Sequence, residues 1–189
     1  CDFAIDALAH PVPFKPFNLG PAINSENSDY YPTFTVDQKE VIFTRDIPDR
    51  NSMEGHQEDF YISLKKDTAW TIARNTGGPL NSEMNEGAPS VSADGKVLFF
   101  TACDRPDGQG SCDIYLSTRM NDGSWSRPMD LGTPVNSAAW ESQPSFSSDG
   151  KTLYFLRGSY DRNRKMQQDI YVSEFQADRT WSQPKKLPD

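Results

Sequence analysis

The chain has 189 residues, of which 35% are hydrophobic, 12% are aromatic and 24% are charged, and its formal net charge is −8. This charge argues against binding to nucleic acid or to an anionic membrane surface, because both require basic patches. The sequence contains no run of about 18 apolar residues, so it predicts no transmembrane segment. The aromatic content and the lack of long alanine- and leucine-rich stretches favour packed β-sheets.

Residues 1–23 form a lead-in to the rest of the chain. Apolar residues at Phe3, Ile5 and Leu8 predict a short helix that ends before Pro11. Two interpretations of Cys1 remain open: it is the lipid-bearing first residue of a mature bacterial lipoprotein, or an arbitrary start of the chain.

From residue 24 onward, one sequence pattern occurs three times. The pattern contains an Asn-Ser pair, a carboxylate three residues before a proline, an aspartate five residues after that proline, an aspartate before an aromatic strand, and a tryptophan. In the first copy these are Asn24, Asp29, Pro32, Asp37, Asp59 and Trp70. In the second they are Asn81, Glu86, Pro89, Asp94, Asp113 and Trp125. In the third they are Asn136, Glu141, Pro144, Asp149, Asp169 and Trp181.

The period of this repeat indicates a stacked or radial array of β-units. It is 57 residues from Asn24 to Asn81 and 55 from Asn81 to Asn136. Each copy holds four β-rich runs, and Asp94-Gly95 and Asp149-Gly150 are strong hairpin-turn signals. We therefore predict an all-β fold, a partial β-propeller of three four-stranded antiparallel blades that belongs to a larger one, for example of six blades.

The predicted boundaries follow the Asn-Ser pairs. Blade one covers residues 24–80, blade two 81–135 and blade three 136–189. Lys15-Pro16 matches Arg127-Pro128 of the second copy in its distance from Asn-Ser. Residues 1–23 are accordingly predicted to be a lead-in followed by the outer strand of an adjoining blade.

Cys103 and Cys112 flank a loop between two strands that are expected to pair. We predict a disulfide between them, which suits an oxidising compartment; two free thiols are the alternative. No nearby histidine or further cysteine completes a zinc site.

The repeated acids predict structural roles. Asp37, Asp94 and Asp149 sit in turns, where an aspartate bonds its own backbone. The aspartates before the aromatic strands are expected to make one structural hydrogen bond per blade. Asp104, Asp107 and Asp113 could supply oxygen ligands to calcium, but their spacing favours a solvated acidic loop. The two histidines, His10 and His56, support no catalytic triad. We expect no catalytic residue, cofactor or metal.

The connections between second and third strands differ most between the copies. They cover residues 45–58, 104–111 and 158–168, and they are expected to emerge on one face as binding loops on a constant scaffold. The third is basic on an otherwise acidic protein. The candidate partner-binding residues are Arg157, Arg162, Arg164, Lys165, Met53 and His56.

The motif Glu-x-x-Pro-Ser-Phe-Ser-x-Asp-Gly-Lys-x-Leu-x-Phe, with the later Asp-Ile-Tyr-x-Ser and Trp-Ser-x-Pro, resembles the TolB-type propeller repeat of bacterial envelope proteins. The longer form seen here is similar to the propeller-bearing OmpA-family lipoproteins of Bacteroidetes, a family that includes the PorE component of the type IX secretion system. The resemblance covers residues 14–189. The peptidoglycan-binding domain of that family lies outside this sequence, so any contact with peptidoglycan would be made through domains absent here.

The resemblance implies a non-catalytic, protein-interaction scaffold in the periplasm, associated with the outer membrane. Its expected partners are other envelope or secretion-system proteins. The alternative is a propeller enzyme that processes glycans or peptides. The scarcity of histidine and the equivalence of the repeated acids favour the scaffold.

Overall fold

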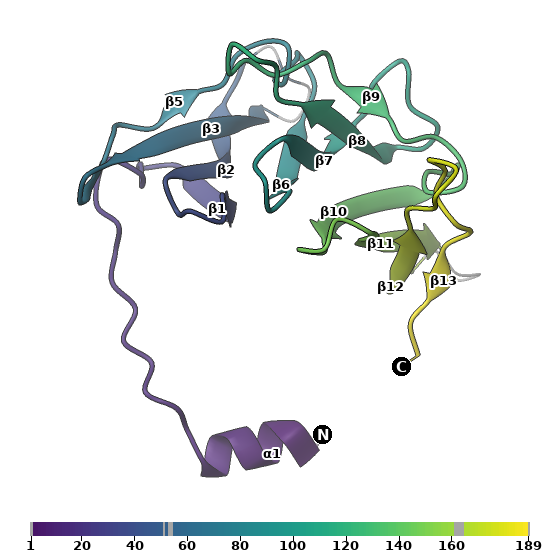
Figure 1. The fold of residues 1–189 in the computed structure, drawn as a ribbon, viewed down its shortest axis with the longest axis horizontal. Helices are drawn as coiled ribbons and strands as arrows, with labels where there is room; N and C mark the ends of the chain where they lie inside the picture. Colours follow the sequence, from purple (N-terminus) through teal and green to yellow (C-terminus); the bar gives the residue numbers. More distant parts are fainter. Residues whose placement is uncertain (1, 51, 53–54, 161–164, 189) are drawn as a thin grey trace.

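The computed structural model describes residues 2–50, 52, 55–160 and 165–188. Apart from the helix α1 (Asp2–Ala9), the elements are β-strands, so the predicted all-β fold is confirmed. Helix α1 stands away from the strands at the end of an extended segment (Figure 1). Residues 10–27 contain no strand. Residues 11–17, which the sequence predicts as the outer strand of an adjoining blade, form no strand in this chain and are exposed.

The strands form three successive units, each an antiparallel series of four. Unit one contains β1 (Ser28–Phe34), β2 (Glu40–Pro48), β3 (His56–Lys66) and β5 (Arg74–Asn75), with the short β4 (Ala69–Trp70) also paired to β3. Unit two contains β6 (Glu86–Val91), β7 (Val97–Cys103), β8 (Cys112–Thr118) and β9 (Met129–Asp130). Unit three contains β10 (Trp140–Phe146), β11 (Thr152–Tyr160), β12 (Met166–Glu174) and β13 (Lys185–Lys186). A single parallel pair, Trp140 with Cys112, links units two and three.

The first strand of each unit carries a bulge before its proline and lies on the concave side of the arc (Figure 1). The bulged residues Tyr31, Ala88 and Gln143 have positive φ angles of 50°, 51° and 53°. Each bulge removes an N–H from the strand ladder. A hydroxyl of the preceding unit accepts it instead: Thr44 from Ala88 at 3.1 Å, and Thr101 from Gln143 at 3.0 Å. The bulges thus connect neighbouring units.

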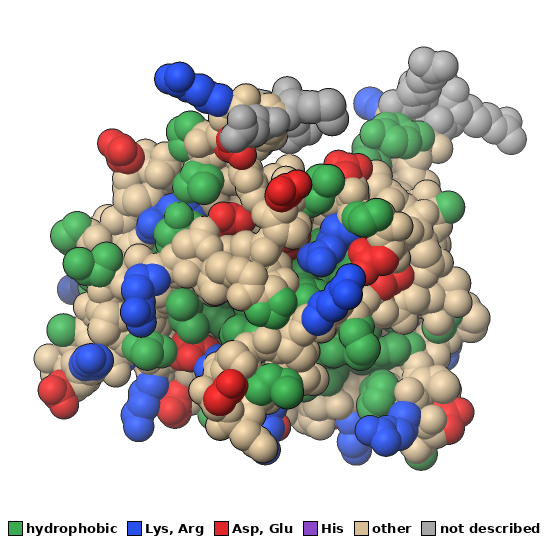
Figure 2. Space-filling model, turned by 90° about the horizontal axis from the view of Figure 1, so that it is seen from above, with side chains coloured by type: hydrophobic (Ala, Val, Ile, Leu, Met, Phe, Trp, Pro, Cys, Tyr) green, Lys and Arg blue, Asp and Glu red, His purple; other side chains and the backbone are tan. Residues whose placement is uncertain are grey.

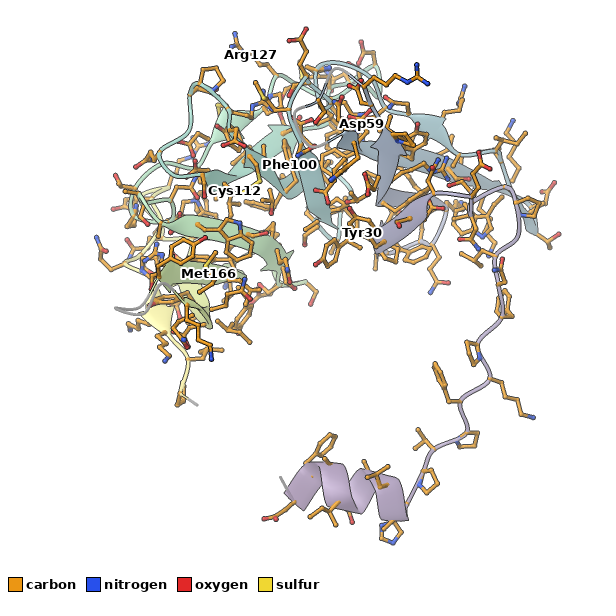
Figure 3. The ribbon with its side chains drawn as sticks, turned by 180° about the vertical axis from the view of Figure 1, so that it is seen from behind. Tyr30, Asp59, Phe100, Cys112, Arg127 and Met166 are labelled. Atoms are coloured by element: carbon orange, nitrogen blue, oxygen red, sulfur yellow. A yellow bond between two sulfur atoms is a disulfide. The ribbon has the colours of Figure 1, made fainter. Side chains whose placement is uncertain are left out.

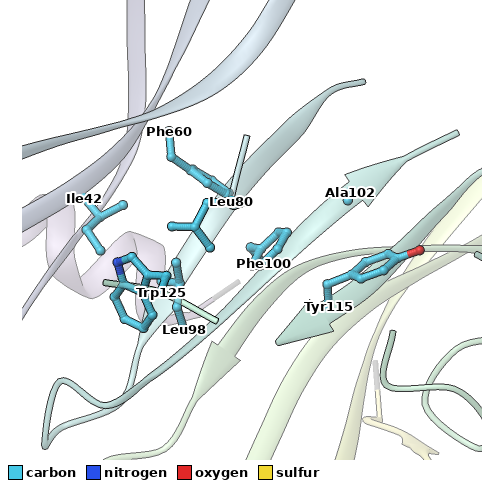
Figure 4. Packing of buried hydrophobic residues seen from close by; sticks show 8 residues of the cluster. All are labelled: Ile42, Phe60, Leu80, Leu98, Phe100, Ala102, Tyr115 and Trp125. Atoms are coloured by element: carbon cyan, nitrogen blue, oxygen red, sulfur yellow. The ribbon is translucent and has the colours of Figure 1, made fainter. Parts of the chain in front are cut away.

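Two of the buried clusters lie between the units, and a further one, Ile23, Val41 and Phe43, lies between unit one and the lead-in. Figure 4 shows the cluster between units one and two, which is Ile42, Phe60, Leu80, Leu98, Phe100, Ala102, Tyr115 and Trp125. An equivalent cluster between units two and three contains Phe99, Ile114, Val135, Leu153 and Phe155. Trp125 and Trp181 each pack on the cluster shared with the preceding unit. The repeated tryptophans are therefore structural.

The outer side of unit three exposes positions that the other units bury. Tyr154 is 40% exposed and Ile170 is 50% exposed. Their counterparts in unit two, Phe99 and Ile114, are 3% and 0% exposed because unit three covers them. On the opposite side of the arc, Phe34 of unit one is 41% exposed. The outer side of unit three thus presents apolar surface of the type that the units bury against each other, whereas on the opposite side Val41 and Phe43 are buried against Ile23 of the lead-in.

Candidate functional site

Each unit begins with a carboxylate that the preceding linker encloses. In unit three, Glu141 is fully buried and accepts hydrogen bonds from the backbone N–H of Ser137 (3.0 Å) and from its hydroxyl (2.6 Å). Arg157 donates to Glu141 from Nε at 2.7 Å, and to the carbonyls of Pro134 and Val135 at 3.3 and 2.7 Å. Its guanidinium, proposed from the sequence as a partner contact, is committed to these internal bonds.

Unit two builds the same buried carboxylate site with a different arginine. The strand position that carries an arginine in units one and three is Ala102 here, and Arg105 of the following loop reaches back to Glu86 at 3.2 Å. The predicted disulfide between Cys103 and Cys112 is present and closes this loop. Burial raises the pKa of Glu86 to about 7, because the loss of water outweighs the hydrogen bonds and the arginine.

The asparagine of each Asn-Ser pair joins one unit to the next. Asn136 is buried; its side chain accepts a hydrogen bond from the backbone N–H of Ile114 and donates one to the carbonyl of Ile114, both at 2.9 Å. Asn81 makes the same two bonds with Phe60, at 2.9 and 3.0 Å. The amide side chain therefore bonds both the N–H and the C=O of one residue in the third strand of the preceding unit, as the backbone of a neighbouring strand would.

The acids of the hairpin turns are structural, as predicted. Asp94 accepts hydrogen bonds from the Ser92 hydroxyl at 2.6 Å and from the backbone N–H of Lys96 at 3.1 Å. These bonds, the hydroxyl first, lower the pKa of Asp94. Asp37 and Asp149 make the equivalent bonds and have lowered pKa values for the same reason.

The loops between second and third strands contain most of the predicted partner-binding residues. Met53, Arg162 and Arg164 lie outside the described residues. His56 and Lys165 are described; His56 Nδ1 lies 3.0 Å from Asp46 Oδ1. No observation here tests the partner-binding role of these residues, which remains a prediction.

Two of these loops rest on the linker that follows their unit. Gln57, in β3 directly after the first loop, donates to the carbonyl of Ser82 at 2.7 Å. In the second loop, a Cβ added to Gly110 would lie 1.9 Å from the carbonyl oxygen of Ala139. After the third loop, Met166 is 37% exposed at the start of β12 (Figure 3). The first two loops are thus held in place by the neighbouring unit.

An apolar cleft of about 720 Å³ opens between units two and three. It lies beside the hairpin turns, and the aromatic side chains in its wall pack on one another: Phe99 with Phe146 at 4.6 Å between ring centroids, and Phe175 with Trp181 at 5.1 Å. The cleft lining includes Val97, Phe99, Leu116, Met129, Phe146, Phe175 and Trp181. The sequence pattern did not indicate this cleft.

The matching position between units one and two is polar. Arg119, which corresponds to Phe175, lies over the ring of Trp125 at 4.4 Å and pairs with the carboxylate of Glu40, which corresponds to Val97. Salt bridges of this kind place opposite charges side by side, and Figure 2 shows Lys and Arg interspersed with Asp and Glu on the outer face. Where units one and two form an ion pair, units two and three therefore present the apolar side chains of Val97 and Phe175.

The described residues contain no group of three or more His, Cys, Asp or Glu able to hold a metal ion. Among the same residues, no helix has the length and apolar character needed to cross a membrane. No family model matches the sequence, and no curated protein matches it.

Solved structures share the fold. A putative TolB from Agrobacterium tumefaciens matches 87% of this chain with a TM-score of 0.53 and 20% sequence identity. A thermostable family-43 glycoside hydrolase matches 89% of this chain with a TM-score of 0.50 and 14% identity. The chain spans 51% and 62% of the length of these two proteins. At these identities the similarity establishes a TolB-like, β-propeller type of fold and nothing about activity.

Proposed function

We propose that the protein is a non-catalytic, protein-interaction scaffold. The observation that carries this proposal is the use of the repeated acids. The carboxylates that open each unit bind the linker and an arginine, and those of the hairpin turns bind the turn itself. The repeated acids thus make contacts that stabilise the fold. In a scaffold of this kind, specificity is carried by the places where the repeats differ.

The three units act, in this proposal, as three four-stranded blades of a larger propeller. The exposed Tyr154 and Ile170 support it, since their counterparts Phe99 and Ile114 are buried between units. The proposed location is the periplasm, in an outer-membrane-associated complex like that of the type IX secretion system. Three features support this location: the resemblance of the repeat motifs, the similarity to a putative TolB, and a disulfide that suits an oxidising compartment.

The proposed partner is an envelope protein that presents an apolar segment to the cleft between units two and three. Aromatic anchors in a partly buried pocket supply most of the binding energy in many protein interfaces. The basic loop 158–168 would add contacts with acidic side chains of the same partner, which steer association.

The test is a pull-down from envelope extracts with the protein as bait. The double variant Val97→Glu/Phe175→Arg places in the cleft the ion pair that Glu40 and Arg119 form at the matching position between units one and two. Because the fold already contains this pair once, the variant should fill the cleft and still fold. We expect it to lose the partner while its thermal midpoint stays within a few degrees of the wild type. The matched control, Ile72→Ser, changes a side chain that is 76% exposed and lies outside the cleft; it should retain the partner.

The basic loop is tested separately. Replacing Arg162, Arg164 and Lys165 by Ser should weaken capture of the same partner and leave the thermal midpoint nearly unchanged. Retention of the partner by both the cleft variant and this loop variant would contradict the scaffold proposal.

A glycan- or peptide-processing enzyme is the alternative. A screen with aryl glycosides and chromogenic peptides should show no turnover. Turnover that is abolished by Glu58→Gln would favour the alternative. Glu58 is an acid outside the repeated pattern that accepts a hydrogen bond from the Tyr30 hydroxyl.

A further inference from the structure

Each unit places an aspartate of its third strand beside a residue of its outer strand. In unit one, Asn75 donates a hydrogen bond to Asp59 at 2.6 Å (Asp59 is labelled in Figure 3). In unit three, the ammonium of Lys186 lies 2.9 Å from the carboxylate of Asp169. Both aspartates therefore face a donor. The strand register that brings these residues together is the same in all units: Tyr61 with Asn75, Tyr115 with Asp130, and Tyr171 with Lys186.

In unit two the outer-strand residue is another aspartate. Asp113 is 2% exposed, and its Oδ2 accepts hydrogen bonds from the backbone N–H groups of Gln109 (2.8 Å) and Gly110 (3.0 Å). Its Oδ1 is buried and has no hydrogen-bond partner among the residues that the structure describes. The strand register puts Asp130 at the outer-strand position that holds a donor in the other units, and an ionised carboxylate donates nothing. A buried anionic oxygen without a partner is costly.

Asp130 accepts its shorter hydrogen bonds at one oxygen and a long one at the other. Its Oδ1 accepts from the backbone N–H of Gly132 at 3.1 Å and from the side-chain amide of Asn136, while its Oδ2 faces the side-chain nitrogen of Gln109 at 3.3 Å. Gln109 thus touches both carboxylates, through its backbone and through its side chain. Burial raises the pKa of Asp113, and the charge of Asp130 raises it further.

We propose that a hard divalent cation, calcium, binds between Asp113 and Asp130. Asp113 Oδ1 and Asp130 Oδ2 would be its ligands, with the side-chain amide of Gln109 turned to present its oxygen and water completing the shell. The cation neutralises two like charges and satisfies the unpartnered oxygen. It does in unit two what an amide does in unit one and an ammonium in unit three.

The loop 104–111 is shaped around this carboxylate pair. A Cβ on Gly108 would lie 2.5 Å from Asp113 Oδ2, so only glycine allows the backbone to approach it this closely. With two protein carboxylates in the shell, the expected dissociation constant is in the range of extracellular calcium modules, about 10⁻⁴–10⁻³ M. Binding would then fix the loop to the sheet at the concentrations found outside the cytoplasm.

The experiment measures the thermal midpoint after chelation, against increasing calcium chloride and against magnesium chloride. A ligand that binds only the folded state raises the midpoint in proportion to the logarithm of its concentration above the dissociation constant. We expect this rise for calcium in the wild type, and a calorimetric titration that gives one site per chain. A calorimetric titration without binding would overturn the proposal whatever the variants do.

The decisive variant is Asp130→Asn, which reproduces the Asp59–Asn75 pair of unit one. Its midpoint without calcium should equal or exceed that of the wild type, and calcium should no longer raise it. The control Asp104→Asn removes one charge from the same loop and should keep the calcium response. A response that persists in Asp130→Asn, or that is lost in Asp104→Asn, would overturn the assignment of the site. A pair that shares a proton instead would give a pH-dependent midpoint indifferent to calcium, which would also overturn it.

Discussion

The asparagine between units offers a direct measure of how strongly one unit holds the next. We predict that Asn136→Ala lowers the stability of the protein much more than Asn24→Ala. Asn136 bonds both the N–H and the C=O of Ile114 in the preceding unit. Asn24 has the same place in the repeat, but its side chain donates to Asn18 of the lead-in, at 2.7 Å in an exposed position.

The magnitude follows from the group left without a partner. In Asn136→Ala, the C=O of Ile114 keeps its hydrogen bond from the backbone N–H of Leu131, but the N–H of Ile114 loses the asparagine side chain, and an unsatisfied buried group costs about 1–3 kcal/mol. A loss of about 2 kcal/mol in the free energy of unfolding is a central value for one such group. For a chain of this length, about 2–4 °C of thermal midpoint corresponds to each kcal/mol, so the midpoint should fall by about 4–8 °C. Asn24→Ala removes one exposed hydrogen bond and should cost about 1 kcal/mol or less.

The assay is thermal unfolding followed by circular dichroism, with urea unfolding as a second measure. Asn81→Ala is a replicate, since Asn81 makes the same pair of bonds with Phe60. An equal loss in the Asn24 and Asn136 variants would refute the reasoning, because it would place the contribution of the asparagine in its own turn and not in the contact between units.

Three further predictions test other parts of the fold. Burial raises the pKa of Glu86 to about 7, from 4.5 for an unburied glutamate, so the folded chain keeps a proton that the unfolded chain releases. Stability should therefore fall as the pH rises from about 4.5 to about 7, by at most about 3 kcal/mol, and Glu86→Gln should abolish this slope in urea titrations. Replacing Cys103 and Cys112 by Ser should cost about 2–3 kcal/mol and remove the effect of reductant on the urea midpoint. Ile114→Ala should cost about 2–5 kcal/mol, but Ile170→Ala, at the same place on the exposed side of unit three, less than about 1 kcal/mol; equal losses would show that both sides are covered.

The parts of the fold that could be predicted from the sequence depend on local chemistry. The hairpin at Asp94-Gly95 was predictable because the aspartate and the glycine act within the turn itself. The disulfide was predictable because Cys103 and Cys112 lie at the two ends of one short connection. In both cases the interacting groups are within about ten residues of each other in the chain.

The parts that could not be predicted depend on contacts between units. The asparagine of the Asn-Ser pair served only as a marker of the repeat, because its partner is the third strand of the preceding unit. Arg157 was assigned to a partner because it borders a basic loop, but its charge is used by Glu141, 16 residues earlier in the chain. The cleft required knowledge that Val97 and Phe175 line one surface.

The third-strand aspartates show a further limit of the argument from repetition. Because Asp59, Asp113 and Asp169 recur, the sequence predicted one common hydrogen bond for all of them. The strand is the same in each unit, but the residue opposite is an amide in unit one and an ammonium in unit three. In unit two it is a carboxylate, so identical residues at the same position of the repeat have different surroundings.

The departures from the repeat are concentrated on one loop, residues 104–111. Arg105 of this loop replaces an arginine that units one and three carry on a strand, and the disulfide holds the loop at its base. Gly110 brings the loop against the linker to unit three, and Gln109 contacts both carboxylates of the proposed calcium site. The contact with the following linker has a parallel in unit one, but units one and three have neither a cysteine pair nor a carboxylate opposite the third-strand aspartate. Four separate contacts thus fix the conformation of this one loop, which suggests that its shape is important for function. We therefore expect the loop to be part of the surface that a partner recognises.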